Sequence, residues 1–356
     1  MDVDTDAELS RRALIKLSGG ALGAASLAGV LSPGVATAAI SAGAARKPKM
    51  VWVTGLLAEW TAPLITGMKD FTDRFRWDLE WVGPSEFDVP TILNMTEAVI
   101  AKKPNVLISM MNAPNAYVPV LQKAIDNGIT VVINNVQVPE DVDKLGLAYV
   151  GQDEFEAGKK SARLAAESAV KKGRKNGVIL VGIQHPDSAN MIQQLAGAKA
   201  GTKEYNKTNG TAFTLENFAD KSLNVAEGIP RYEAKLAALG GELAAIIASS
   251  HGGGQAAVKV LQGKKRRPGD VPIGVIGAVF AITGPQIKQG WVQWGLDQQT
   301  YMQGYVAAAL GWAASAGKYG ISGYNTGGGV VTKANINAIM KREAGWNAKA
   351  KKLGLI

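Results

Sequence analysis

The stretch GWVQWGLDQQTYMQGY, from Gly290 to Tyr305, changes from a strand pattern to a helix pattern within a few residues. Residues 291–296 are rich in strand-forming side chains, whereas apolar residues recur at helical spacing from 302 to 312. A polar segment, 297–301, lies between the two patterns. We therefore predict that the chain crosses from one domain to another at this segment, and that the segment contacts a ligand.

The composition indicates two domains without disulfides. A length of 356 residues with 47% hydrophobic content is enough for two cores of ordinary size. The chain has no cysteine, which excludes disulfides, thiolate catalysis, cysteine-ligated zinc and a lipid-modified N-terminal cysteine. The two histidines, His185 and His251, are too few for a histidine-rich metal site. We expect no metal and no cofactor.

The formal net charge of +9 raises the question of nucleic-acid binding. The basic runs at 171–172, 264–267 and 349–352 contain no interleaved aromatic residues, which a nucleic-acid surface commonly has. We interpret these runs as solvated surface and expect no nucleic-acid partner.

The N-terminus has the pattern of an export signal. The segment SRRALIK, at 10–16, precedes a mildly apolar stretch at 17–30, and the small residues at 36–38 suit a cleavage site. Arg11 and Arg12 before a weak hydrophobic core match the twin-arginine signal. A cytosolic amphipathic helix or a retained membrane anchor fits less well, because the apolar run is short and glycine-rich for a membrane span. We expect a signal peptide at 1–38, a linker at 39–48 and a periplasmic or otherwise exported protein that is soluble after cleavage.

From residue 49 onward, apolar strands alternate with amphipathic helices. The first series has strands at 49–53, 77–82, 106–110, 130–134 and 147–151, with helices at 63–74, 89–102, 116–127 and 155–172. A second series of the same kind runs from a strand at 177–182 to a strand at 271–277, and its last helix is at 255–263. Short links between these elements indicate parallel sheets that are covered on both faces. We predict an α/β fold of two similar doubly wound parallel-sheet lobes.

Candidate ligand residues follow the carboxyl ends of the predicted strands, because loops from these ends converge on a crevice in open parallel sheets. In the first lobe they are Glu59, Trp60, Ser109, Asn112, Asn134 and Asn135. In the second lobe they are Gln184, His185, Ser188, Phe218, Ser249 and Ser250, and Gln298 lies at the crossing. Most of these side chains are neutral and form hydrogen bonds.

Three of these candidates also have a structural interpretation. Trp60 fits a core aromatic or a platform on which a sugar ring stacks, and its small and polar neighbours favour stacking. Asn134 and Asn135 fit either a turn cap or a pair of amides that contact a ligand. Phe218 fits the core and the pocket equally.

The segment DQQTYMQGY, at 297–305, resembles a motif of the sugar-binding proteins of ABC importers, in the ribose-binding-protein-like group of type I periplasmic binding proteins. Thr300 stands where those proteins usually have proline. The segment 147–153 resembles their first crossing strand, and 324–333 resembles their last. The resemblance implies three hinge crossings, near Gly151, Gln298 and Thr326. The N-terminal lobe is then 49–150 with 299–326, and the C-terminal lobe is 151–298 with 327–356.

The resemblance also implies roles for single residues. Trp60 and Phe218 lie where related proteins place aromatic residues at the sugar, and Gln298 lies at the position of the hinge glutamine. Ribose-type relatives have two aspartates and two arginines at the positions of Asn134, Asn135, Gln194 and Ala278. These four positions are neutral together, so no buried charge is left unpaired. We expect a neutral, less hydroxylated ligand, and an apolar pocket side formed by 274–280.

Two motifs suggest other chemistry. His251 and the glycines at 252–254 follow a strand and open a helix, which fits phosphate binding or a flexible helix start, although no Lys-Ser/Thr pair follows at Walker spacing. Ser250 beside His251, with Asp187 in another loop, suggests an exported hydrolase. Residues adjacent in sequence rarely point at each other, and no G-x-S-x-G elbow is present. We expect a binding protein and not an enzyme.

Taken together, these patterns favour an exported protein that captures a small neutral solute, a sugar or polyol, between two closing lobes. The resemblance implies that a monomer delivers the solute to the permease and ATPase subunits of an ABC importer. The alternative from another class is a sensory subunit that presents its ligand state to a receptor or kinase.

Overall fold

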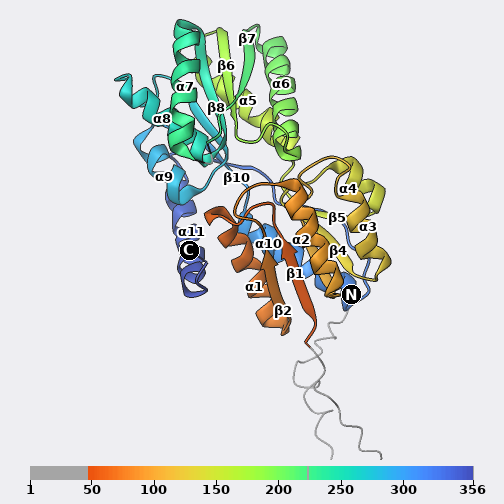
Figure 1. Cartoon of the computed structure of the whole chain (residues 1–356). Helices are drawn as coiled ribbons and strands as arrows, with labels where there is room; N and C mark the ends of the chain where they lie inside the picture. Colours follow the sequence, from red (N-terminus) through yellow and green to blue (C-terminus); the bar gives the residue numbers. More distant parts are fainter. Residues whose placement is uncertain (1–46, 223, 356) are drawn as a thin grey trace, which may run out of the picture. The chain divides into compact units, whose positions relative to one another are not determined.

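The structure, a computed structural model, describes residues 47–222 and 224–355 (Figure 1). The expected signal peptide and most of the expected linker lie outside the described residues. Within the described part of the chain, no helix is both long and apolar enough to cross a membrane. The strands form two six-stranded sheets.

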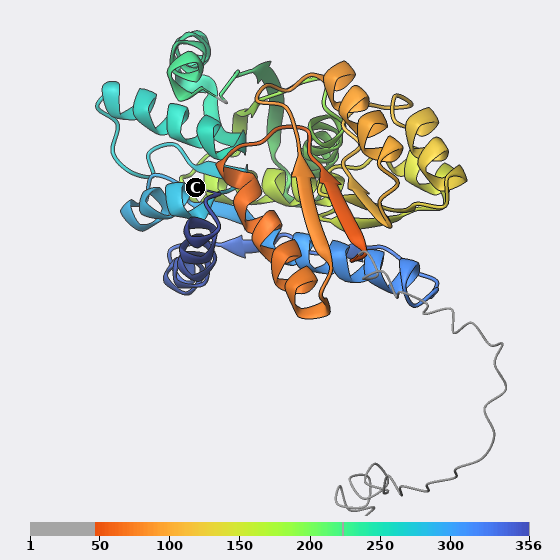
Figure 2. The ribbon, with the colours of Figure 1, turned by 60° about the horizontal axis from the view of Figure 1, so that its bottom comes forward.

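The first sheet is parallel throughout, with the strand order β11-β5-β4-β3-β1-β2. Its strands are β1 (Lys49–Val53), β2 (Asp78–Val82), β3 (Val106–Ser109), β4 (Thr130–Asn134), β5 (Ala148–Gly151) and β11 (Tyr324–Asn325). Its helices are η1 (Glu59–Thr61), a 3-10 turn, and α1 (Ala62–Phe75), α2 (Val89–Ala101), α3 (Val118–Asp126), α4 (Pro139–Leu145) and α10 (Thr300–Ser315). Helices α1 and α10 cover one face of this sheet and α2 and α3 the other (Figures 1 and 2).

The second sheet has the strand order β12-β10-β9-β8-β6-β7 and is parallel except for β12, which pairs antiparallel with β10. Its strands are β6 (Asn176–Ile183), β7 (Ala212–Ala219), β8 (Leu243–Ser250), β9 (Ile273–Gly277), β10 (Trp294–Asp297) and β12 (Gly329–Val331). Its helices are α5 (Glu154–Lys171), α6 (Ala189–Asn209), α7 (Val225–Leu239), η2 (Gly240–Glu242), α8 (His251–Gly263), α9 (Phe280–Gln289) and α11 (Ile336–Lys352).

The predicted fold class of two doubly wound α/β sheets is confirmed. Three helices of the structure were not predicted. Helix α4 has only seven residues and α9 contains Pro285, so that neither has a strong helical pattern of hydrophobic residues. Helix α11 does have apolar residues at helical spacing, Ile336, Ile339 and Met340, and was missed. The helix predicted from Gln255 begins instead at His251, because the Ser250 hydroxyl caps it by accepting a hydrogen bond from Gly253 N.

The central strands are apolar because helices cover both of their faces. In β1, Met50, Val51, Trp52 and Val53 are fully buried, and every residue of β8 is buried. Strands of parallel sheets that are covered on two faces need continuous apolar runs rather than alternation. These continuous apolar runs are the pattern from which the strands were predicted.

Glycines allow one pair of helices in each lobe to touch backbone to backbone. A Cβ on Gly67 of α1 would lie 2.1 Å from Tyr301 O, and one on Gly304 of α10 would lie 2.0 Å from Leu64 O. A Cβ on Gly158 of α5 would lie 2.0 Å from Gln194 O, and one on Gly197 of α6 would lie 1.9 Å from Phe155 O. A larger residue would force each pair apart. These two contacts fix the helix ends from which ligand-site side chains project.

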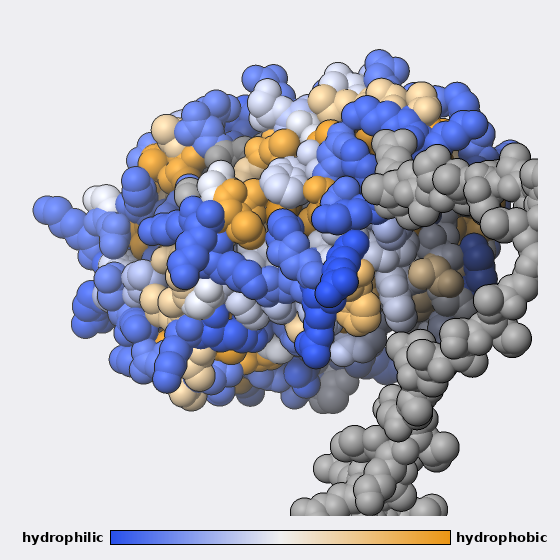
Figure 3. All heavy atoms as spheres, turned by 90° about the horizontal axis from the view of Figure 1, so that it is seen from below, coloured by the Kyte–Doolittle hydropathy of each residue, from blue (hydrophilic) through white to orange (hydrophobic). Residues whose placement is uncertain are grey.

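The surface is mostly hydrophilic on the side seen in Figure 3, with hydrophobic residues in small separate groups. All residues of the basic runs at 171–172 and 264–267 are exposed, as are the lysines at 349, 351 and 352. This exposure agrees with their interpretation as solvated surface.

Candidate functional site

A cavity of about 470 Å³ lies where the carboxyl ends of the strands of both sheets meet. Residues after β1, β2, β3 and β4 line one side, and residues after β6, β8 and β9 line the other. Residues after β5 and β10, where the chain passes between the sheets, line it as well. A third group of lining residues comes from α11. The volume is within the range of sites for small organic ligands. Two other hollows, of about 860 and 430 Å³, have walls rich in long charged side chains from a single lobe.

Eleven of the fourteen candidate residues named from the sequence line this cavity. They are Glu59, Trp60, Asn112, Asn135, Gln184, His185, Ser188, Gln194, Ser249, Ser250 and Gln298.

The other three proposed residues, Ser109, Asn134 and Phe218, have structural contacts instead. Ser109 is fully buried, and its hydroxyl donates to Met110 O over 3.1 Å. The Asn134 side chain donates to the backbone oxygens of Gln303 and Val150, at 3.2 and 3.4 Å. Phe218 packs edge-to-face on Tyr232, with ring centroids 4.9 Å apart. None of these three is among the cavity-lining residues.

Trp60 is placed by a single tight turn. It lies in η1, where Thr61 Oγ1 donates to Ala58 O over 2.7 Å and so holds the turn. The indole is half-buried, packs against the core of the first lobe and also lines the cavity. This placement leaves part of the indole available for the apolar side of a ligand.

Asn135 is held in an uncommon backbone conformation. Its φ is +64°, in the left-handed region that asparagine tolerates better than most residues. Its Nδ2 donates to Gln303 Oε1 over 2.8 Å, and Tyr149 Oη lies 2.9 Å from its carbonyl oxygen. The amide therefore has a fixed orientation at the cavity wall before a ligand binds.

Glu154 is a buried carboxyl group that the sequence interpretation missed. One of its oxygens accepts from Gln152 Nε2 over 2.9 Å and from Gln194 Nε2 over 2.7 Å. Burial raises its pKa to about 7, although the two amides lower it in part. In the sequence, Asp153 and Glu154 resemble an ordinary helix start, and Asp153 does cap α5 by accepting from Glu156 N.

The amides beside Glu154 have unused acceptors. Gln152 Oε1 and Gln194 Oε1 are buried and have no hydrogen-bond partner among the described residues. A buried acceptor without a partner is costly. Gln194 is only 4% exposed and lines the cavity, whereas Gln152 is not among the cavity-lining residues.

A second missed carboxyl group, Glu343, reaches the cavity from α11. Burial and, to a smaller extent, the negative charge of Asp297 raise its pKa to about 7. Arg342 and the backbone N–H groups of Ala281 and Phe280 lower it in part. The pocket side expected to be apolar, 274–280, therefore has a carboxyl group beside it. No local pattern in the sequence indicates this contact, because Glu343 is far along the chain from this loop.

The two histidines also line the cavity. Burial lowers the pKa of His185 and of His251, which favours neutral imidazoles. The His185 ring stacks on Phe87, with centroids 4.9 Å apart. Among the described residues, no group of three or more histidine or carboxylate side chains is arranged to hold a metal ion.

The glycines after His251 permit close packing. A Cβ on Gly252 would lie 2.0 Å from Ser222 O, and one on Gly254 would lie 2.7 Å from a methyl carbon of Val275. The Ser250 hydroxyl pairs with Ser222 Oγ at 3.0 Å and accepts from Gly253 N, and no hydrogen bond of the described residues joins it to His251. A nucleophile and base pair is therefore not formed here.

Comparison with known proteins identifies the family. A sequence profile described as periplasmic binding protein domain matches residues 50–319. The chain belongs to this family. Its members are solute-binding proteins, and this periplasmic binding protein is accordingly not an enzyme. A search of curated proteins found no match.

Solved structures show the same type I fold in sugar-binding proteins. A glucose-galactose binding protein from Geobacillus stearothermophilus has a TM-score of 0.71 and 20% identity, with 81% of this chain and 98% of that chain covered. A solute-binding protein from Burkholderia graminis C4D1M, in complex with D-arabinose, has a TM-score of 0.71 and 23% identity, with 81% and 96% covered. A carbohydrate transporter from Acidothermus cellulolyticus 11B, in complex with myo-inositol, has a TM-score of 0.70 and 20% identity, with 83% and 97% covered.

In this periplasmic binding protein, Gln303 joins two of the segments that pass between the sheets. Its Nε2 donates to Gln298 O over 3.0 Å and to Thr326 Oγ1 over 3.2 Å. Thr326 Oγ1 in turn donates to Gln298 O over 2.9 Å, and Gln299 Nε2 donates to Thr326 O over 2.7 Å. Because Gln303 is fully buried, these hydrogen bonds are protected from water and hold the two segments in register.

The loops on the two sides of the cavity also touch each other. Ala189 N, at the start of α6, donates to Asn112 O over 3.0 Å. Gln193 Nε2 donates to Gln137 O over 2.9 Å. These contacts join residues that follow β6 to residues that follow β3 and β4, and so bridge the two walls.

Proposed function

We propose that the protein is an exported solute-binding protein that captures a small neutral solute, a sugar or polyol, and delivers it to an ABC importer. The observation that carries this proposal is the cavity between the two sheets, with Trp60 on one wall and the Gln194 amide on the other. Related structures hold D-arabinose, myo-inositol, D-allose and α-D-tagatopyranose, which are all neutral and polyhydroxylated.

The chemistry of the walls supports a hydroxylated ring. An indole face suits the C–H face of a sugar ring, while hydroxyl groups at the ring edge need hydrogen-bond acceptors. The side chains of Gln194 and Glu154 line the cavity and carry such acceptors. The amide of Asn135 and the side chain of Gln298 add further polar contacts. The carboxyl groups also fit a cationic ligand. The affinity for a cationic ligand would fall with salt, whereas the affinity for a neutral sugar would not.

The working step of this proposal is lobe closure rather than chemistry. The moving parts are residues 49–150 with 299–326, and residues 151–298 with 327–356, with hinges near Gly151, Gln298 and Thr326. A ligand that contacts both lobes favours the closed form, because only that form makes all of its contacts. Gln303 and Thr326 join two of the hinge segments, which supports a concerted motion.

A binding screen tests the proposed function. Purified protein is screened by thermal shift against D-arabinose, D-allose, D-tagatose, myo-inositol, D-glucose, D-galactose and nucleosides, followed by calorimetry at low and high salt. We expect at least one sugar or polyol to bind with little salt dependence, and a deletion strain to lose uptake of that solute. Affinity that collapses with salt contradicts a neutral ligand, and unchanged uptake contradicts delivery to an importer.

Export by the twin-arginine route is part of the proposal and has its own test. Replacing Arg11 and Arg12 together by lysine should leave the precursor in the cytoplasm, because the route reads the arginine pair. Fractionation and immunoblotting of the two forms measure this. Unchanged delivery of the mature protein argues against the route without affecting the ligand proposal.

A further inference from the structure

Helix α11 begins in the core of the second lobe. Ile336 is 1% exposed and belongs to the core cluster that contains Phe280 and Ile287. Ile339 and Met340 pack against the same cluster. The first turns of α11 are therefore anchored to α9 and move with the second lobe.

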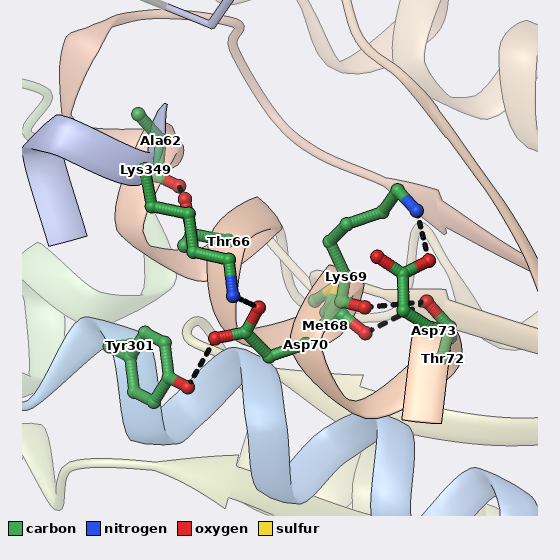
Figure 4. A network of polar contacts seen from close by, with 9 residues as sticks. All are labelled: Ala62, Thr66, Met68, Lys69, Asp70, Thr72, Asp73, Tyr301 and Lys349. Atoms are coloured by element: carbon green, nitrogen blue, oxygen red, sulfur yellow. Dashed lines mark hydrogen bonds and ion pairs between the residues drawn. The ribbon is translucent and has the colours of Figure 1, made fainter. Parts of the chain in front are cut away.

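The second half of α11 is fastened to the first lobe. Trp346 stacks on Tyr301 of α10, with centroids 4.8 Å apart and planes at 8°. Tyr301 Oη donates to one oxygen of Asp70 in α1 over 2.7 Å, and Lys349 forms an ion pair with the other oxygen (Figure 4). The Asp70 carboxylate thus receives one group from α10 and one from α11. We call Asp70, Tyr301, Trp346 and Lys349 the clasp.

Arg342 connects the clasp to Asp297, next to the second crossing between the lobes. Arg342 lies over the Trp346 ring at 4.8 Å, and its Nη1 donates to Asp297 Oδ2 over 2.8 Å. Asp297 is the last residue of β10 and directly precedes Gln298. The position of α11 is therefore set by contacts at both of its ends.

The remaining face of α11 points into the cavity. Glu343, Asn347 and Lys351 line it, and residues four apart lie above one another on a helix. The three side chains therefore form a single polar stripe. On the other faces of the same helix lie the clasp residues and exposed side chains such as Lys341.

We propose that α11 forms a third wall of the ligand site, in which Glu343 and Asn347 hydrogen-bond ligand hydroxyls and determine which sugar or polyol fits. The inference rests on the proposed function, since it names further contacts of the same site. A carboxyl oxygen and an amide one turn apart match two hydroxyl groups of a polyol and discriminate between epimers, because a misplaced hydroxyl leaves a polar group unpaired. The clasp supplies the rigidity that such discrimination needs.

A purely structural role for Glu343 is the main rival. Its carboxyl lies near the N–H groups of Phe280 and Ala281 in the first turn of α9, where it could act only as a cap. A cap affects stability equally with and without a ligand. A ligand contact changes affinity and the order of preference among sugars, so that the two roles give different measurements.

The test compares Glu343→Gln and Asn347→Ala with wild type and with Lys341→Ala as the control on the exposed face. Affinities for D-arabinose, D-allose, D-tagatose, myo-inositol, D-glucose and D-galactose are measured by calorimetry, and Tm by thermal denaturation. We expect each cavity-facing variant to lose about tenfold or more in affinity for the best sugar, and to change the order of preference. The Lys341→Ala variant should match wild type.

The outcomes separate this inference from the proposed function. If wild type binds a sugar and both variants bind all sugars as wild type does, α11 is not a wall of the site, even where Tm falls. If wild type binds none of the six, the proposed function fails and this inference fails with it. Glu343→Gln keeps the size of the side chain, and Asn347→Ala alters a different turn of the helix. If one of these variants fails to fold, the other variant still tests the inference.

Discussion

Gln194 Nε2 lies 2.7 Å from a carboxyl oxygen of Glu154, and the helices that carry these two residues touch through Gly158 and Gly197. The glycines are the reason for this short distance, because larger residues would separate α5 from α6. The hydrogen bond in turn orients the Gln194 amide so that its oxygen has no partner among the described residues. Helix packing thus sets the polarity of one cavity wall.

The pKa of Glu154 predicts a pH-dependent stability. Its pKa in the folded chain is about 7, raised by burial from an ordinary value of 4.5. Between these two values the folded state keeps the proton and the unfolded state has lost it, so the free energy of unfolding falls as pH rises through this range. Glu154→Gln can keep both hydrogen bonds through its amide oxygen. It should remove part of the fall, up to about 3 kcal/mol between pH 5 and 8.

Urea unfolding at several pH values measures this effect. Glu156→Gln is the control, since Glu156 is an exposed residue on the same helix. Glu343 contributes a fall of the same sign, so the Glu154 variant should still retain some pH dependence. Parallel curves for wild type and Glu154→Gln contradict the prediction.

Gly197→Ala should destabilise the protein and weaken ligand binding. The new Cβ would lie 1.9 Å from Phe155 O, so α5 and α6 must separate, at a cost of about 1–3 kcal/mol. Gly345→Ala is the matched control, because a Cβ there meets nothing within 4 Å in the middle of α11. That variant should gain about 0.5–1 kcal/mol from helix propensity. Opposite signs in urea unfolding are expected, and equal effects speak against the packing argument.

Trp60→Ala should reduce affinity for the best sugar by up to about a hundredfold. The variant loses stacking, worth roughly 0.5–1.5 kcal/mol, together with buried apolar area, for a total approaching 3 kcal/mol. Tyr319→Ala removes an exposed aromatic residue outside the cavity and serves as the control. Calorimetry that finds unchanged affinity for Trp60→Ala excludes the indole as a sugar platform.

Gln303→Ala should loosen the connection between the lobes. The truncation leaves the Asn135 side chain without its acceptor and removes a donor from Gln298 O, at a cost of about 1–3 kcal/mol in stability. Small-angle scattering of the ligand-free protein should show a changed distribution of lobe separations. Gln122→Ala, on the exposed face of α3, should leave both stability and scattering as in wild type. Scattering identical to wild type would rule out a hinge role for Gln303.

Within the predicted site, the pleat of a strand separates neighbours that look alike in sequence. Asn134 and Asn135 are adjacent amides after the same apolar run, yet Asn134 bonds to Gln303 O in the interior and Asn135 lines the cavity. Successive side chains of a strand point to opposite faces, and the positive φ of Asn135 turns it further. The exact end of β4 decides between the two residues, and strand ends are poorly defined by sequence patterns.

Local patterns in the sequence were sufficient for the two α/β series and for placing Trp60 and Gln298 at one crevice, whereas Gln194 followed from the family resemblance. Hydrophobic periodicity is a short-range property, and loops at the carboxyl ends of parallel strands converge whatever their sequence. Only the tertiary structure brought Glu154 and Glu343 to the cavity and folded α11 over it. The pKa of each carboxyl depends on burial by segments that are distant in the chain. The clasp joins Asp70 to Lys349, which are separated by most of the length of the chain. No local pattern could therefore reveal the shifted pKa values or the clasp.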